Sequence, residues 1–225
     1  CASVYGNEPQ VGASLQQIMA DGVPREELWV TSKVWNDKHK PADLVASCKK
    51  SLHDLRLDYL DLYLVHWPFP NFHPEGCDVS YHDPDAKPYI HAVFMETWQA
   101  MESLVSAGLV RSIGTSNMTV PKMKLLLRDC SIRPVVNEME LHPHFQQAGF
   151  YNYLVSNGIQ PVGFCPIGSP SRPARDRTET DTCEFDDQNI GTIAKRLGVH
   201  PAYVCLAWAI QRGEVVIPFS VKSEQ

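Results

Sequence analysis

Residues 59–67 read YLDLYLVHW, an almost continuous apolar run that ends in a histidine and a tryptophan. Runs of this kind are typical of strands that are covered on both faces, as in parallel sheets. Similar β-rich runs recur along the chain, and segments with helical periodicity alternate with them. The other runs are residues 28–34, 110–116, 134–140, 160–166 and 214–220. This alternation predicts a parallel sheet with crossover helices.

The predicted helices leave two architectures to compare. Helical periodicity covers residues 11–20, 41–57, 92–107, 120–128, 146–157, 190–197 and 201–212. A doubly wound sheet usually carries a glycine-rich phosphate loop after its first strand, and the sequence contains no G-x-G-x-x-G pattern. A closed (β/α)8 barrel needs eight strands and typically ~250 residues. The sequence therefore predicts a (β/α)8 TIM barrel truncated at both ends, without its first two strands and its C-terminal helix.

The predicted barrel is a single partial domain over residues 1–225, with two long irregular segments. Residues 68–90 are rich in proline and aromatic side chains, and loops of this length in compact domains are usually functional or disordered. Residues 168–187 form the second segment, which is rich in polar residues.

Composition excludes several classes of function. The chain of 225 residues has a net charge of −6 and no basic run, which argues against nucleic-acid binding. No apolar run approaches the ~20 residues that span a bilayer, so no membrane partner is expected. The 7 cysteines form no C-x-x-C pair and fit reduced thiols, some of them in the core, of a cytoplasmic protein.

Lys33 stands at the end of an apolar run, and the C-terminal ends of barrel strands carry the active site. Such a lysine either extends to water along its aliphatic stem or is a cation beside an ionisable partner. Tyr5 precedes the first predicted helix and would lie at the same end of a preceding strand. A cation beside a tyrosine lowers the phenol pKa from about 10, so that the phenol could give up a proton near neutral pH.

His66 also ends a run, and two interpretations of it stay open. It is either a satisfied core histidine or the group that orients a carbonyl oxygen. A metal-dependent barrel hydrolase would instead use His66 together with His142 and His144 as ligands. The sequence shows no evident carboxylate ligands for that site, which argues against a metal.

Short polar groups follow neighbouring runs. Ser116 and Asn117 could cap the next helix or, together with Glu138, bind the amide of a flat ligand. Phe164 is either a core aromatic residue or a surface on which a flat ring stacks.

Several motifs together resemble the aldo-keto reductase family. The matching segments, in the family's order and approximate spacing, are CASVYGNE, TSKVW, DLYLVHWP, VRSIGTSN, VVNEMELHPHF, GFCPIGSP and VIPFS. The resemblance covers the chain from Cys1 to Gln225. It implies a (β/α)8 barrel that reduces aldehydes and ketones, including sugar aldehydes, with NAD(P)H and without a dinucleotide-binding glycine loop.

The resemblance implies roles for individual residues. Tyr5 resembles the proton donor, Lys33 the lysine that lowers its pKa, and His66 the histidine that positions the substrate carbonyl. Cofactor contacts are implied for Ser116, Asn117 and Glu138 at the carboxamide and for Phe164 at the nicotinamide face. Cys165, Ile167 and Ser169 lie where a loop covers the pyrophosphate, and residues 168–187 are the segment expected to cover the cofactor. Ser220, Val221 and Lys222 are implied at the adenosine end. Trp35, Trp67 and the 68–90 loop resemble the walls of the substrate pocket.

Four departures from the family pattern affect these expectations. The aspartate that pairs with the family's lysine stands directly before the segment that aligns with Cys1. Glu138 replaces a glutamine, Phe219 stands where a lysine is common, and Gln225 stands where an arginine is common. The last two remove cations that would bind the 2′-phosphate of NADP(H). The resemblance to the family still favours NADP(H), and NAD(H) stays open. A non-catalytic binding or structural member of the family is the alternative to an enzyme that acts on small carbonyl compounds or alcohols.

Overall fold

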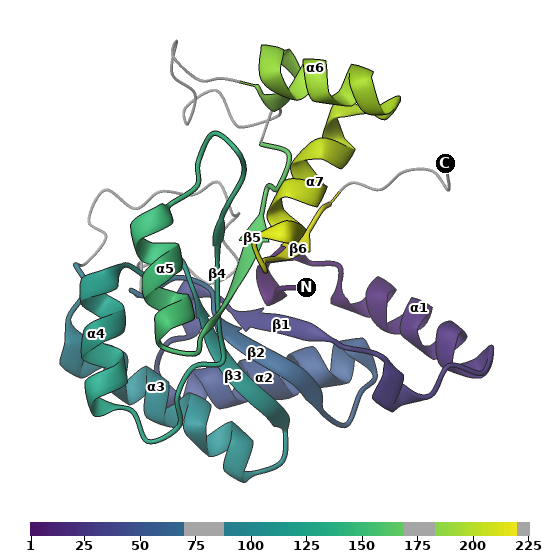
Figure 1. Ribbon diagram of the computed structural model, residues 1–225. Helices are drawn as coiled ribbons and strands as arrows, with labels where there is room; N and C mark the ends of the chain where they lie inside the picture. Colours follow the sequence, from purple (N-terminus) through teal and green to yellow (C-terminus); the bar gives the residue numbers. More distant parts are fainter. Residues whose placement is uncertain (70–87, 169–182, 220–225) are drawn as a thin grey trace. The chain divides into compact units, whose positions relative to one another are not determined.

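The computed structural model describes residues 1–69, 88–168 and 183–219, and the chain divides into two compact units, Cys1–Val136 and Asn137–Gln225. The first unit contains a parallel sheet in the order β1-β2-β3, formed by Thr31–Val34, Leu60–Val65 and Val110–Ser116 (Figure 1). Its register pairs Lys33 with Leu64 and Val65 with Thr115. All six residues of β2 are buried, as expected for a strand covered on both faces.

Helices alternate with these strands. They are α1 (Glu8–Ala20), α2 (Pro41–Leu55), α3 (His91–Ser106) and α4 (Val120–Asp129), and a short 3-10 turn, Ser3–Tyr5, precedes α1. The core of this unit includes Cys48, Trp98 and Met101, which are fully buried. Cys48 is thus one of the small core residues that the sequence predicted.

The second unit begins within β4 (Val136–Glu140) and continues with the same alternation. Its sheet has the order β4-β5-β6, with β5 at Gln160–Phe164 and β6 at Val215–Ile217, and β5 and β6 pair in parallel. The helices are α5 (Ala148–Ser156), α6 (Gln188–Leu197) and α7 (Pro201–Gln211). Cys205 of α7 is buried.

Every predicted strand and helix has a counterpart among the described residues, and the differences lie at the ends. β6 has 3 residues where the sequence predicted 214–220, and β1 begins at Thr31 rather than at residue 28. Trp29, inside the predicted run, is 67% exposed, because apolar composition alone does not show which residues join the ladder. No helix in the described ranges is both long and apolar enough to cross a membrane.

His39, between β1 and α2, makes stability sensitive to acid. The side chain is buried, burial lowers its pKa to about 4, and neither ring nitrogen has a hydrogen-bond partner among the described residues. An unfolded histidine titrates near 6.5. Between these values the unfolded chain binds more protons than the native one, so the free energy of unfolding falls as pH falls.

We therefore expect His39→Leu to remove part of this acid sensitivity. Denaturant unfolding measured from pH 7.5 to 4.5 should show a loss of stability that is smaller in the variant by up to roughly 3 kcal/mol. His53→Leu is the matched control, because the side chain of His53 is 87% exposed. Equal pH slopes in wild type and His39→Leu would contradict the prediction.

Candidate active site

Three ionisable side chains gather at one end of the first unit's sheet. Lys33 lies in β1, His66 directly follows β2, and Tyr5 ends the short turn before α1. Because β1 and β2 are parallel and pair Val34 with Val65, Lys33 and His66 lie at the same C-terminal end of the two strands. The Tyr5 ring lies 5.8 Å from the His66 ring, and the Lys33 Nζ lies 5.6 Å from the centre of the Tyr5 ring.

Lys33 is a buried cation. Its residue is 3% exposed, and its Nζ donates a hydrogen bond to the main-chain oxygen of Cys1 at 3.2 Å. The interpretation in which this side chain extends to water is therefore wrong. Burying an ammonium costs free energy unless nearby groups favour its charge. The Tyr5 ring is one neighbour that can interact with this charge.

His66 is held in its neutral form. It is 9% exposed, and burial followed by the charge of Lys33 lowers its pKa to about 3. Its ring contacts Trp35 edge-on at 4.9 Å, and its Nδ1 has no hydrogen-bond partner among the described residues, so it is not a satisfied core histidine. A neutral imidazole has one N–H to donate, which suits a group that polarises an uncharged oxygen.

Ser116 ends β3 and Asn117 follows it, and Asn117 contacts both Ser116 and His66. The side-chain Nδ2 of Asn117 donates to the main-chain oxygen of His66 at 3.0 Å and to the Ser116 Oγ at 3.1 Å. Asn117 has a positive φ of 57°, which turns the chain away from the strand. The N-cap position of α4 is Thr119, which makes no capping side-chain hydrogen bond, so neither Ser116 nor Asn117 occupies the capping position considered for them.

The two tryptophans expected to form the pocket walls differ in exposure. Trp35 is buried against His66, whereas Trp67 is partly exposed and its ring lies 6.2 Å from that of Phe69. Residues 70–87 of the predicted substrate loop lie outside the described residues.

The remaining predicted cofactor residues belong to the second unit. Glu138 is buried in β4, and Phe164, Cys165 and Ile167 stand at and after the end of β5, where Cys165 has a positive φ of 51°. Ser169, Ser220, Val221 and Lys222 lie outside the described residues.

His142 and His144 pair with carboxylates inside the second unit. His142 contacts Glu140 at 3.1 Å and also Glu184, while His144 contacts Asp187 at 3.0 Å. Asp187 also caps α6, and bonds from main-chain nitrogens and from His144 lower its pKa. No group of three metal-ligating side chains with suitable geometry occurs in the described part of the chain.

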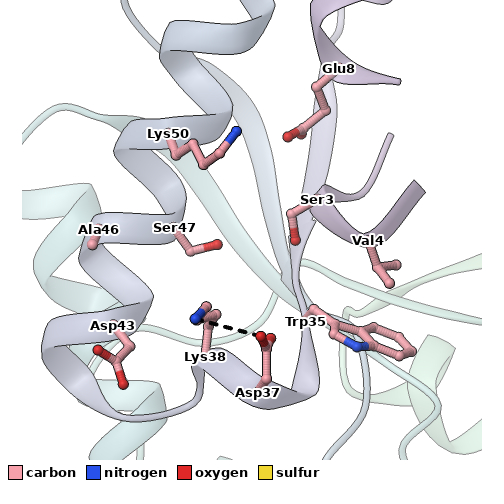
Figure 2. Close-up of a pocket in the computed structure, with 10 residues that line it drawn as sticks. All are labelled: Ser3, Val4, Glu8, Trp35, Asp37, Lys38, Asp43, Ala46, Ser47 and Lys50. Atoms are coloured by element: carbon pink, nitrogen blue, oxygen red, sulfur yellow. Dashed lines mark ion pairs between the residues drawn. The ribbon is translucent and has the colours of Figure 1, made fainter. Parts of the chain in front are cut away.

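A cavity of about 570 Å³ lies in the first unit, beside the segment that precedes α1. It is lined by Ser3, Val4, Glu8, Trp35, Asp37, Lys38, Asp43, Ala46, Ser47 and Lys50. Figure 2 shows the side chains of α2 on one side of it and Ser3, Val4 and Glu8 on the other. The two lysines of its lining are paired with nearby carboxylates, since Lys38 lies 3.6 Å from Asp37 and Lys50 pairs with Asp54. Tyr5, Lys33 and His66 are not among the residues that line it.

Glu8 is a buried residue that the sequence analysis did not select. The order NEPQ reads as an ordinary helix start with an acidic first turn, and it contains no signal for burial. The partners of its carboxylate, Ser32 and Ser51, are distant in sequence and come together only in the folded chain.

Comparison with known proteins gives a consistent result along the chain. A family model described as "Aldo/keto reductase family" matches residues 1–225. An aldo/keto reductase of Synechocystis sp. is 42% identical over 230 residues, which cover 100% of this chain and 68% of that protein. The aldose reductase of Schistosoma japonicum superposes with a TM-score of 0.84 at 33% identity, covering 99% of this chain and 69% of that one. A silkworm aldo-keto reductase crystallised with NADPH gives a TM-score of 0.83 at 33% identity, and the match covers 98% of this chain and 64% of that one.

Proposed function

The chain belongs to the aldo/keto reductase family, a family of oxidoreductases, and we propose that it reduces aldehydes and ketones to alcohols with Tyr5 as the proton donor. The observation that carries this proposal is the cluster in the first unit. A buried Lys33 lies 5.6 Å from the Tyr5 ring, and a neutral His66 lies 5.8 Å from the same ring. That residues 1–225 form a single partial (β/α)8 barrel domain remains a prediction for this protein.

The cluster supplies what carbonyl reduction requires of a protein. His66 donates its N–H to the carbonyl oxygen and orients it, and its low pKa keeps it neutral throughout the working range. Tyr5 donates a proton to the oxygen as negative charge develops there. Lys33 favours the phenolate that remains, so its charge stabilises the transition state more than the bound substrate.

Ser116 and Asn117 fit the carboxamide of a nicotinamide. Both Nδ2 hydrogens of Asn117 are engaged, one with His66 and one with Ser116. For a ligand, the Asn117 Oδ1 can accept a hydrogen bond and the Ser116 hydroxyl can donate one. These match the NH2 and C=O of a carboxamide. When bound, the cofactor supplies the hydride.

NADP(H) is the favoured cofactor. Structural neighbours of this chain were crystallised with NADPH and with NADP. Phe219, exposed after β6, stands where the family commonly has a lysine, so use of NAD(H) stays part of the proposal. Glu138, Phe164, Cys165, Ile167, Ser169, Ser220, Val221 and Lys222 are the other proposed contacts, and small aldehydes, sugar aldehydes and ketones are the proposed substrates.

The test is binding and turnover measured on the same preparation. Fluorescence titration with NADPH and separately with NADH gives the two dissociation constants. Loss of NADPH absorbance with an aromatic aldehyde, an aldose and a ketone gives turnover. We expect tight binding of NADPH and reduction of at least one of these substrates. Cofactor binding without turnover of any of them would instead support the non-catalytic alternative.

A further inference from the structure

Glu8 connects three elements of the first unit through its carboxylate. It is the first residue of α1 and is 4% exposed. Its Oε1 accepts a hydrogen bond from the Ser32 Oγ at 2.6 Å, and its Oε2 accepts one from the Ser51 Oγ at 2.9 Å. Both serines are buried, in β1 and α2 respectively. A carboxylate removed from water in this way is retained only when such bonds replace its hydration.

The positions of these residues relate the carboxylate to the catalytic pair. Ser32 directly precedes Lys33 in β1, and Glu8 follows Tyr5 after a short turn in which Gly6 has a positive φ of 66°. A bond between Glu8 and Ser32 therefore joins the segment that carries the phenol to the strand that carries the ammonium.

Contacts on the other side of Tyr5 complete the attachment. The main-chain nitrogen of Cys1 donates to the oxygen of Thr31 at 2.9 Å, and the Ser3 Oγ donates to the oxygen of Lys33 at 3.3 Å. Tyr5 itself is half exposed, and its ring contacts His66 and Lys33. Hydrogen bonds before Tyr5 and, through Glu8, after it also attach this segment to β1.

Helices α1 and α2 pack closely enough for Glu8 to reach Ser51. Gly12 lies one turn after Glu8, and a Cβ added to it would lie 2.3 Å from the main-chain oxygen of Asp54. Only glycine permits this approach of the two helices. Figure 2 shows the Glu8 carboxylate pointing from the start of α1 toward α2. The position at the N-terminus of α1 also favours a negative charge.

We propose that Glu8 is a positioning residue for carbonyl reduction, which holds the Tyr5 turn against β1 so that the phenol and the Lys33 ammonium keep their spacing. This inference rests on the roles proposed for Tyr5 and Lys33. The interaction of the two groups weakens with distance, and small displacements of reacting groups can cost about 10²-fold in rate. Glu8 acts through Tyr5 and touches neither substrate nor cofactor in this role.

The experiment compares Glu8→Ala, Glu8→Gln and Ser32→Ala with the control Thr97→Val. In the control a buried hydroxyl is also removed, one that donates to the main-chain oxygen of His39 or of Val93, but Thr97 lies in α3, which carries none of Tyr5, Lys33 and Glu8. We expect Glu8→Ala to lower kcat by at least ~10-fold with the cofactor Kd changed less than about 3-fold. The alkaline limb of its kcat/KM profile should move to higher pH, because the phenol is less influenced by Lys33. Glu8→Gln, which keeps the shape, should recover most of the rate.

Ser32→Ala provides a second variant if Glu8→Ala does not fold, and it should show the same pH shift with a smaller loss of kcat. Thr97→Val should lose stability without changing kcat or the pH profile. Glu8→Ala or Ser32→Ala with a wild-type pH profile and wild-type kcat would overturn the inference. The Tyr5→Phe variant in the same assay separates the two proposals. If it is inactive while the Glu8 and Ser32 variants are normal, only the positioning role fails; if it retains full turnover, the proposed function fails as well.

Discussion

Tyr5→Phe is expected to lower kcat for carbonyl reduction by about 10²–10⁴-fold and to leave the NADPH dissociation constant nearly unchanged. The phenol hydroxyl gives its proton only as the carbonyl oxygen gains charge, so its removal affects the transition state and not cofactor binding. His66 does not replace it, because its pKa of about 3 leaves it neutral at working pH. Since Tyr5 is 51% exposed, the variant should also keep its thermal stability.

Single-turnover absorbance with saturating NADPH measures the chemical step, and a fluorescence titration measures cofactor affinity. The matched control is Tyr203→Phe, because Tyr203 is an exposed tyrosine on α7 that has no proposed role. A parallel loss of turnover and of NADPH affinity in Tyr5→Phe would count against proton donation as the role of this residue.

Lys33→Met is expected to reduce kcat by about 10²-fold while leaving the protein at least as stable as wild type. Methionine has a similar length and no charge, so the variant removes a cation that is buried at 3% exposure without leaving a large cavity. The alkaline limb of the kcat/KM profile should move to higher pH, because the phenol loses the cation that favours its ionised form. The His66 pKa should rise from about 3, since Lys33 is its second cause of lowering after burial.

NMR titration of the His66 ring measures that rise, and denaturant unfolding measures stability. Lys50→Met is the control, because the side chain of Lys50 is 74% exposed and its ammonium pairs with Asp54 on the surface of α2. An unchanged His66 titration together with wild-type turnover in Lys33→Met would show that Lys33 has no electrostatic effect on this site.

The sequence by itself determined the elements and the candidate catalytic residues. Periodicity is a local property of ten to twenty residues, so the alternation of strands and helices is visible without any tertiary contact. Because the ends of parallel strands meet at one edge of a sheet, the positions of Lys33 and His66 at the ends of their runs were sufficient to predict that they lie together. The ends of the strands were less predictable, since an apolar residue such as Trp29 can stand outside the ladder.

The tertiary structure alone decided which polar groups are buried and what they contact. Lys33 could have reached water from its strand end, and only its environment shows that it does not. Glu8 reads as a common helix start, yet its carboxylate bonds Ser32 and Ser51, which lie 24 and 43 residues away. Hydrogen bonds over such separations depend on how closely helices approach, here at Gly12 beside Asp54, and no local pattern of residues encodes that distance.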